Sequence, residues 1–399
     1  MTSSSNRVYT PQYFQVLVGG MLTMIGVSMA YHFGEYAAFL GYSKADLGWI
    51  MAIGSCGSLI LRPFAGGWID RVGCRFAFVG SALPAAAANL LLPFATSFAA
   101  ISALRVLIAA ANATYLATVA VYASHAAPPE RRAESLGTVG IGGFVGMWIG
   151  PAIGDAIFRD GPTPQAMRTF FVSIAVVTAL AGIAVLNLRL PRGNGRVPAS
   201  AFFRLARTSW PGTIVLVSVV FTAMLTIHIT FLERFAHDRG FDDIRYFFYV
   251  YAPTAIGIRI VFRRAPQVIG RRRICVVGMG VLGVGTLLLI PVRTEWHLIF
   301  PALLTAIGHA LVFPSMVDLT AQAFPPEHRG VGTSLALGAG DIGFIIGGVA
   351  WGHLIEKRGF VPVFVIGAAA SWLTALLYAW RRRLELREPV PTDSTSLAA

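Results

Sequence analysis

The feature that most constrains the fold is a short basic segment, expected to form a loop, that occurs twice in this chain of 399 residues. Residues 66–75 read GGWIDRVGCR and lie between two apolar runs, and residues 265–273 read APQVIGRRR in the same setting. Gly73 of the first segment and Gly270 of the second are 197 residues apart (270 − 73). A segment that recurs at the same phase of two half-chains indicates an internal duplication.

The duplication extends beyond these segments, because the same offset relates residues across several apolar runs. The further pairs are Arg62 and Arg259, Pro128-Pro129-Glu130 and Pro325-Pro326-Glu327, Arg132 and Arg329, Gly143 and Gly340, Gly146 and Gly343, and Gly150 and Gly347. A single offset held over this length predicts two halves of one fold, related by an axis along the membrane normal.

The composition places these halves in lipid. Charged residues make up 13% of the chain and hydrophobic residues 55%, whereas a soluble domain carries about 25% charge. Residues 169–188, 274–292 and 360–380 are long apolar runs. Each is close to the roughly 20 residues that a helix needs to cross a bilayer, and helices satisfy their own backbone hydrogen bonds in lipid. The fold expected is an all-α integral membrane protein.

We expect twelve transmembrane helices in two pseudo-symmetric six-helix halves. The spans lie near residues 13–38, 46–66, 75–94, 98–124, 135–158, 168–189, 211–234, 244–263, 274–292, 297–323, 331–354 and 361–381. The domains are therefore residues 1–190, a cytoplasmic linker at 191–210, residues 211–384, and a disordered cytoplasmic tail at 385–399. Arginine gathers in the loops on the side of the two termini, which makes that side cytoplasmic by the positive-inside rule.

Several classes of function are disfavoured by the same pattern. The net charge of +13 resides largely in arginines of short loops between apolar runs, so we expect no nucleic-acid partner. Cys56, Cys74 and Cys275 are isolated and lack the spacing of a metal site, and we expect no metal and no cofactor. The chain contains no phosphate-binding loop ending in Gly-Lys-Ser/Thr, and no nucleophile constellation that would indicate an enzyme.

The first basic segment resembles the signature of the major facilitator superfamily, and the resemblance covers essentially the whole chain. Gly66, Asp70, Arg71, Gly73 and Arg75 match that signature, while Cys74 replaces one of its basic residues. The second copy has Gln267 where the acid would align. The resemblance implies a twelve-helix transporter but says little about its cargo.

The fifth predicted span carries a second, more discriminating pattern. Gly137, Gly146, Gly150, Pro151 and Gly154 follow the spacing of the antiporter signature, with Asp155 in place of its last glycine. The pattern is similar to that of the drug:proton antiporter branch, and residues 308–314 resemble bacterial sugar-efflux and multidrug permeases. Glycines spaced by four residues share one helix face, so this helix is expected to pack closely against a neighbour.

Asp70, Arg71 and Arg75 form the candidate cytoplasmic latch. Asp70 can pair with a nearby arginine or lie at the positive N-terminus of a neighbouring helix. Breaking such a pair would cost about 1–3 kcal/mol, which is enough to shift the populations of two conformations. The alternative is that these residues only anchor the segment at the membrane surface.

Ionisable residues inside spans are costly and often functional. Glu35 and Asp341 are the candidates for proton coupling, with Arg105 as their charge partner, although each acid can instead form a fixed ion pair. Arg62 and Arg259 lie near the cytoplasmic loops, so we expect their side chains to snorkel to the surface. Asp155 and Glu233 lie near the outer surface and are expected to be solvated helix ends.

The resemblance implies that helices 1, 4, 7 and 10 line the transport cavity. Residues of these helices then become substrate-cavity candidates, namely His32, Tyr36, Tyr115, His228 and His309. Histidine exchanges protons near neutral pH. The alternative for each side chain is that it packs in the protein interior.

The function predicted is secondary active transport, with proton-coupled efflux of a small organic molecule by alternating access. The partners are the cargo, protons and the lipid bilayer; the chain is expected to be a monomer of the bacterial inner membrane with both termini cytoplasmic. The alternatives are an organic-anion or monocarboxylate carrier, or a metal-chelate exporter, of the same fold. A transport-like sensor or a membrane enzyme is a remote alternative.

Overall fold

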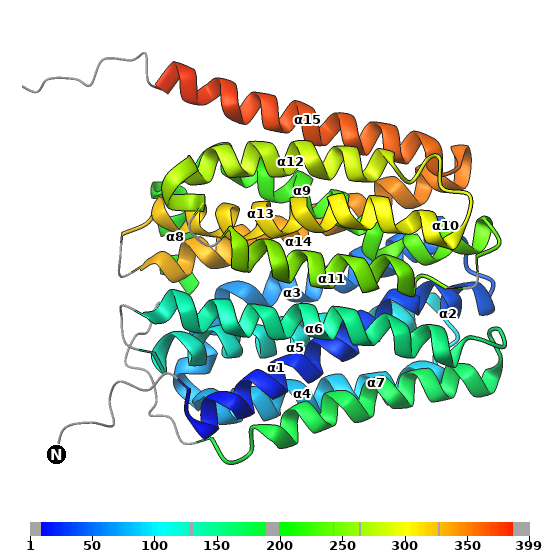
Figure 1. Ribbon diagram of the computed structural model, residues 1–399. Coiled ribbons are helices and arrows are strands. Elements are labelled where there is room, and N and C mark those ends of the chain that lie inside the picture. Colours follow the sequence, from blue (N-terminus) through cyan, green and yellow to red (C-terminus); the bar gives the residue numbers. More distant parts are fainter. Residues whose placement is uncertain are drawn as a thin grey trace, which may run out of the picture.

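The protein is an all-helical bundle in a computed structural model that describes residues 9–127, 131–188, 199–241, 243–262, 265–325 and 328–385. Its helices run nearly parallel or antiparallel to one another (Figure 1). The chain traverses the bundle six times before residue 190 and six times after residue 210. The predicted fold of two six-helix halves is therefore confirmed.

The first half consists of α1 to α7. Its elements are α1 (Pro11–Met29), η1 (Ala30–His32) and α2 (Phe33–Phe39), which together form the first traverse, followed by α3 (Lys44–Val72), α4 (Cys74–Leu91) with η2 (Leu92–Phe94), α5 (Phe98–His125), α6 (Arg132–Ile157) and α7 (Pro164–Ala184). The second half repeats this order with α9 (Ile214–Thr230) and α10 (Leu232–Asp238), α11 (Arg245–Val261), η4 (Pro266–Gly270) with α12 (Arg271–Leu287), η5 (Glu295–Leu298) with α13 (Ile299–Gln322), α14 (Arg329–Arg358) and α15 (Phe360–Glu385).

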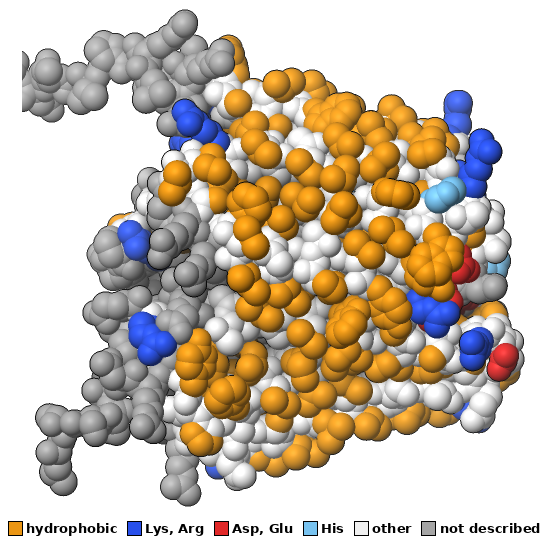
Figure 2. Space-filling model, in the orientation of Figure 1, with side chains coloured by type: hydrophobic (Ala, Val, Ile, Leu, Met, Phe, Trp, Pro, Cys, Tyr) orange, Lys and Arg blue, Asp and Glu red, His pale blue; other side chains and the backbone are white. Residues whose placement is uncertain are grey.

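The bundle has the dimensions and surface of a membrane protein. In the described part of the chain, nine helices are long and apolar enough to cross a bilayer, and the bent pair α9 and α10 makes ten. The helices α11 and α12 are shorter, with 17 residues each. Figure 2 shows hydrophobic side chains over the broad middle of one face and charged side chains towards its two ends.

The positions of the helix ends distinguish the two ends of the bundle. α1 begins and α15 ends at the same end, here called the terminal end (Figure 1). The opposite end, where α2 ends and α3 begins, is called the far end.

The repeated basic segment is mostly helical, which differs from the predicted loop. α3 continues to Val72 and α4 begins at Cys74, so Gly73 alone makes the turn. Its φ of +82° lies in the region that favours glycine, and Gly270, its counterpart 197 residues later, has φ +92°. The repeat in sequence therefore corresponds to the same backbone turn in each half.

The predicted linker contains a further helix. Residues 199–208 form α8 (Ala199–Thr208), which contacts both α3 and α14. The remaining linker residues up to 198, and residues 386–399 of the predicted tail, lie outside the described residues. α8 thus touches one helix of each half at the terminal end.

The glycine row of α6 packs against α1. A Cβ atom on Gly146 would lie 2.6 Å from Met24 Cβ, and one on Gly150 would lie 2.7 Å from the Ile25 carbonyl oxygen. The Ser28 hydroxyl also donates to the Gly146 carbonyl oxygen, at 2.8 Å. These distances leave no room for a side chain, so the two backbones approach closely.

The same arrangement recurs in the second half. A Cβ atom on Gly343 of α14 would press on the Val219 backbone of α9, and one on Gly347 would lie 3.0 Å from the Ala223 backbone. Since Gly343 and Gly347 follow Gly146 and Gly150 by 197 residues, the duplication preserves the contact as well as the glycines. Each half therefore has a tightly packed pair formed by its first and fifth traverses.

We expect Gly150→Ala to lower the thermal midpoint of the purified protein. The added methyl group would meet the Ile25 and Met29 backbones, and overpacking of this kind costs about 1–3 kcal/mol. Differential scanning fluorimetry in detergent measures the effect. The matched control is Gly137→Ala in the same helix, where nothing lies within 4 Å of the new atom. Equal midpoints for the two variants would contradict the close-approach account.

Candidate functional site

The two halves meet along two helix pairs, and α3 with α14 forms the more extensive one. Towards the far end, a Cβ atom on Gly348 would lie 2.8 Å from the Gly48 carbonyl oxygen. One on Gly352 would lie 2.8 Å from the Lys44 carbonyl oxygen. The second pair is α6 with α11. The seam between the halves therefore includes direct backbone contact.

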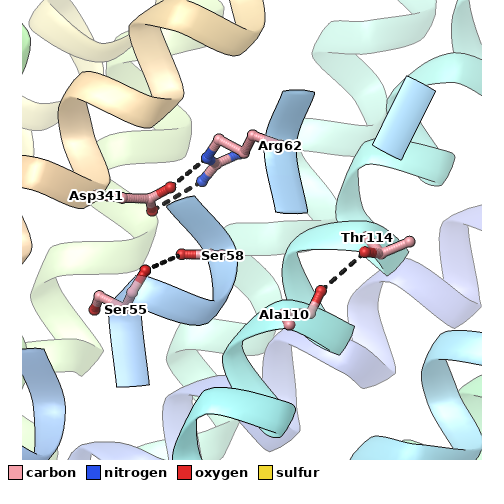
Figure 3. A network of polar contacts seen from close by, with 6 residues as sticks. All are labelled: Ser55, Ser58, Arg62, Ala110, Thr114 and Asp341. Carbon is pink, nitrogen blue, oxygen red and sulfur yellow. Dashed lines mark hydrogen bonds and ion pairs between the residues drawn. The ribbon is translucent and has the colours of Figure 1, made fainter. Parts of the chain in front are cut away.

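An ion pair crosses this seam between α3 and α14. Arg62 holds Asp341 with two hydrogen bonds: Nε donates to Oδ2, and an Nη donates to Oδ1 at 3.0 Å. Figure 3 shows the guanidinium and the carboxylate facing each other from the two helices. The side chains are 18% and 13% exposed. A bidentate pair of this kind orients both groups as well as neutralising them.

This pairing changes the expected role of three residues. Asp341 takes Arg62 as its partner, not Arg105, and Arg62 does not snorkel to the surface. Arg105 lies elsewhere: its guanidinium covers the Phe33 ring at 4.9 Å, and an Nη contacts Met51 Sδ at 3.2 Å. Its Nε is buried and has no hydrogen-bond partner among the residues that the structure describes.

The far end of the seam is held by polar contacts from one half to the other. The Lys44 ammonium pairs with Asp238, and the Lys44 backbone N–H donates to Glu356 Oε2 at 3.1 Å. Arg234 also donates to the Tyr42 carbonyl oxygen, at 3.3 Å. In this conformation, contacts between the halves close the bundle at its far end.

A small cavity towards the far end is lined by both halves. His32 and Asp155 face it from the first half, and His32 Nε2 lies 2.7 Å from Asp155 Oδ1. The same oxygen accepts the Ile244 backbone N–H of the second half at 3.3 Å. A Cβ atom on Gly154 would overlap the His32 ring, so the last matched glycine of the antiporter pattern makes room for this histidine.

Two more carboxyl groups line this cavity. Glu35 approaches from α2 and Glu233 from α10. Asp155 and Glu233 are each only 5% exposed, so neither is the solvated helix end expected from the sequence. Both groups of this glutamate pair carry negative charge when ionised.

His309 is buried among aromatic rings. It hydrogen-bonds to the Tyr251 hydroxyl and lies 5.5 Å from the rings of both Phe221 and Phe144. Phe144 belongs to α6 of the first half, so this cluster spans the seam. The Arg259 guanidinium covers the Phe144 ring at 4.6 Å, and no described residue forms a hydrogen bond with its buried Nε.

The remaining cavity candidates make contacts within their own halves. The Tyr36 hydroxyl lies 2.6 Å from the carbonyl oxygens of Leu92 and Ala95, and Tyr115 donates to the Ala181 carbonyl oxygen at 2.8 Å. His228 Nδ1 donates to the Met224 carbonyl oxygen at 3.2 Å, and Nε2 lies 3.4 Å from the Thr305 hydroxyl. These side chains anchor helices to one another.

The candidate latch is described only in part. Arg71 and Arg75 are exposed at the terminal end, and the Arg75 guanidinium lies over the Phe76 ring at 5.9 Å. The side chain of Asp70 lies outside the described residues, so the latch stays a prediction. Within the described part of the chain, no group of three or more His, Cys, Asp or Glu residues is arranged to hold a metal ion.

Comparison with known proteins assigns the chain to a family. The model of the Major Facilitator Superfamily matches residues 14–266 and 261–398. The chain belongs to this superfamily of membrane transporters. It is a multi-pass membrane protein, as its apolar helices require.

Curated relatives share part of its length. The uncharacterized MFS-type transporter YhhS of Escherichia coli K12 is 24% identical over 257 residues, which are 64% of this chain and 62% of that protein. YhhS of Salmonella typhimurium LT2 is 26% identical over 167 residues, 42% of this chain and 41% of that protein. The chain thus spans about two fifths of the Salmonella relatives it matches.

Solved structures share the fold over nearly the whole chain. The nucleoside transporter NupG, as a D323A mutant, superposes with a TM-score of 0.77 at 13% identity, over 92% of this chain and 99% of that one. The human organic anion transporter MFSD10 gives 0.69 at 17% identity, over 92% and 99%. Likeness at this level of identity concerns the fold alone.

Four residues that the sequence analysis places at the surface make contacts at the seam. They are Arg62, Arg259, Asp155 and Glu233. The offset of 197 residues between Arg62 and Arg259 was a usable signal, because the same phase in both halves argues against two unrelated snorkelling arginines. Asp155 and Glu233 offered no such signal, since distance from a predicted helix end does not reveal what covers it.

Arg62 and Asp341 should be energetically coupled. Arg62→Gln or Asp341→Asn leaves the other group partly buried without its partner, which costs about 1–3 kcal/mol. The double variant removes both charges and should lose less than the sum of the single losses. Thermal midpoints of the four proteins measure this coupling.

The control cycle uses Arg271 and Asp318. This pair is 39% and 42% exposed, and exposed pairs contribute about 0–1 kcal/mol. The Arg62–Asp341 cycle should therefore show the larger non-additivity. Additive losses in both cycles would mean that the cross-seam pair contributes no coupling.

Proposed function

We propose that this protein is a proton-coupled secondary transporter that moves a small organic molecule by alternating access. The observation that supports the proposal is the seam between the two duplicated halves. A few polar contacts that can break join the halves, and the backbones of α3 and α14 are in direct contact towards the far end. A transporter of this kind needs two arrangements of its halves that differ by only a few kcal/mol.

The closed far end corresponds to one of these arrangements. Breaking Lys44–Asp238 and the contact between Arg234 and Tyr42 would let α2 and α10 separate. Arg62–Asp341 lies deeper in the seam and would hold the halves together as they rock. In the opposite arrangement, Asp70 with Arg71 and Arg75 would latch the terminal end.

The orientation in the membrane follows from charge. Arg71 and Arg75, with Arg271, Arg272 and Arg273, lie at the terminal end, and the positive-inside rule places such residues in the cytoplasm. The far end then faces the outside of the bacterial inner membrane, and both termini are cytoplasmic. In this orientation export carries the cargo from the terminal end to the far end. The protein is proposed to act as a monomer.

Proton coupling is proposed to use Glu35 and Asp341. Glu35 lies in a cavity that few water molecules can fill, where loss of charge on protonation removes repulsion from neighbouring acids. Asp341 lies in the seam, where protonation would release Arg62. Each acid thus links its charge to a contact between the halves.

Coupling is tested by transport driven with a pH gradient. A thermal-shift screen of metabolites and drugs first identifies a ligand, because binding stabilises the folded state. Uptake of that ligand into inverted vesicles should accelerate when the interior is acidic. Glu35→Gln and Asp341→Asn should retain exchange but lose the response to the gradient, and the exposed Asp160→Asn should keep it. Wild-type uptake that ignores the gradient would eliminate proton coupling.

An organic anion is the second candidate cargo, and Arg259 favours it. This guanidinium lies at the seam beside an aromatic cluster, and in the described part of the chain no carboxylate pairs with it. A carboxylate or phosphate group would supply the missing partner, while Phe144 and Tyr251 offer apolar surface to the rest of the molecule. Arg105, for which no carboxylate partner occurs among the described residues either, could take a second acidic group.

Arg259→Gln should weaken binding of anionic ligands about 10- to 100-fold, because a hydrogen bond to a charged group contributes about 1.5–3 kcal/mol. Titration of each ligand found in the thermal-shift screen measures the affinity. Arg168→Gln, at an exposed position of the far end, is the control and should bind like the wild type. Equal affinity of the wild type and Arg259→Gln for every anionic ligand would contradict the proposal that the cargo is an organic anion.

A further inference from the structure

The cavity at the far end is small, acidic and shared by the two halves. Its volume is about 40 Å³, which is room for about two or three water molecules. Glu35, Asp155 and His32 line it from the first half, and Glu233, Asp243 and His237 line it from the second. Its walls can therefore stay together only if the acidic charges are balanced.

Two of the four acids have hydrogen-bond or ion-pair partners. Asp155 accepts hydrogen bonds from His32 and from the Ile244 N–H. Asp243 forms an ion pair with Arg245. These contacts leave the charge of the other two acids, Glu35 and Glu233, to be accounted for.

Glu233 is the acid whose carboxylate oxygens lack a hydrogen-bond donor among the described residues, while the charge of the neighbouring Arg234 acts on it through space. Both of its carboxylate oxygens are buried, and neither accepts a hydrogen bond from a described residue. One of them presses against the Gly34 backbone of the other half, where a Cβ atom would overlap it. Arg234, next along α10, directs an Nη to the Tyr42 carbonyl oxygen. The buried carboxyl is thus directed into the cavity and towards the first half.

The neighbour of Glu233 in the cavity is Glu35, an acid from the opposite half. Two ionised carboxylates side by side in a site with little water repel each other strongly. A single proton changes the interaction, because one carboxyl can then donate an O–H···O hydrogen bond to the other. The same proton also supplies the hydrogen-bond partner that Glu233 lacks.

A metal ion is a poorer fit to this cavity than a proton. The four carboxyl groups and two histidines do not converge, and no three such side chains in the described part of the chain are placed to coordinate a metal. Sharing a proton needs only two carboxyl groups, and the two glutamates meet that requirement across the seam.

We propose that Glu35 and Glu233 form a proton-binding site across the seam, and that occupancy of this site by one proton holds the far end closed. This inference rests on the alternating-access part of the proposed function and adds Glu233 to it. When the far end opens, water reaches the pair and the proton leaves as hydronium, which makes both groups carboxylates. Repulsion between them then keeps α2 and α10 apart, so acid favours the closed far end and alkali the open one.

Other titratable groups face the same cavity and need to be separated from this pair. His32 and Asp155 lie within hydrogen-bond distance of each other at the cavity wall, and His237 lies on α10 with Glu233. Protonation of either histidine would add positive charge near the acids, whereas protonation of the glutamates removes negative charge. Replacing one glutamate with glutamine removes only the second effect, because the amide is neutral at every pH.

Double electron–electron resonance between spin labels across the far end tests the proposal. Labels at Gln165→Cys and Thr294→Cys occupy exposed positions of the two halves, in a background with Cys56, Cys74 and Cys275 replaced by alanine. In the full-length protein in lipid nanodiscs, the short-distance population should shrink as the pH rises from mildly acidic to mildly alkaline. Glu233→Gln and Glu35→Gln should keep the short distance over the whole range.

Asp160→Asn is the matched control, because the Asp160 carboxyl is exposed at the same end and lies outside the cavity. The distance distribution of this variant should change with pH as that of the wild type does. A Glu233→Gln protein that follows the wild-type pH dependence would overturn the proposal. So would a wild-type distance distribution that ignores pH, and this result needs no variant to fold.

Transport by the same protein separates this inference from the proposed function. If the distances respond to pH as expected while transport ignores a pH gradient, proton coupling fails and the far-end site stands. If transport follows the gradient while the wild-type distances do not move, the far-end site fails and proton coupling stands.

Discussion

The contact between α3 and α14 is the constraint on which the rest of the structure depends. Gly48, Gly348 and Gly352 bring the two backbones together near the far end, and side chains larger than hydrogen would separate them. Farther along the same helices, Arg62 reaches Asp341. The seam thus combines close backbone contact with a partly buried ion pair, and under the proposed alternating access the first would act as a pivot and the second as a contact that can break.

Lipid makes the position of every charge significant. A charged side chain near the middle of a bilayer costs several kcal/mol unless another group compensates it. In the described part of this protein the compensation often lies in the opposite half: Arg62 holds Asp341, Arg259 covers Phe144, and Asp155 accepts the Ile244 N–H. These charged groups are compensated only while the two halves are in contact. The electrostatic energy of the seam therefore depends on how the halves are arranged.

Sequence reasoning was strongest where one helix determines the outcome. The four-residue spacing of Gly146, Gly150 and Gly154 predicted a face for close packing, and the structure places α1 on that face. It was weaker for Tyr36 and Tyr115, because a tyrosine on a cavity-lining helix can point inwards or anchor its own half, and here the hydroxyls bind backbone carbonyls. It assigned Arg62 to the surface, since the distance of a residue from a helix end does not show which helix lies opposite.

By itself, the sequence determined the all-α class, the duplication and the turn glycines, because length, hydropathy and backbone conformation are local properties. A segment of about 20 apolar residues becomes a helix in lipid whatever its neighbours are. Only the tertiary structure decided which charges meet, since Glu35 with Glu233 and Arg62 with Asp341 are far apart in the chain and lie on different halves. Their interaction depends on how the halves dock, and docking is set by packing summed over many helices, which no single stretch of sequence contains.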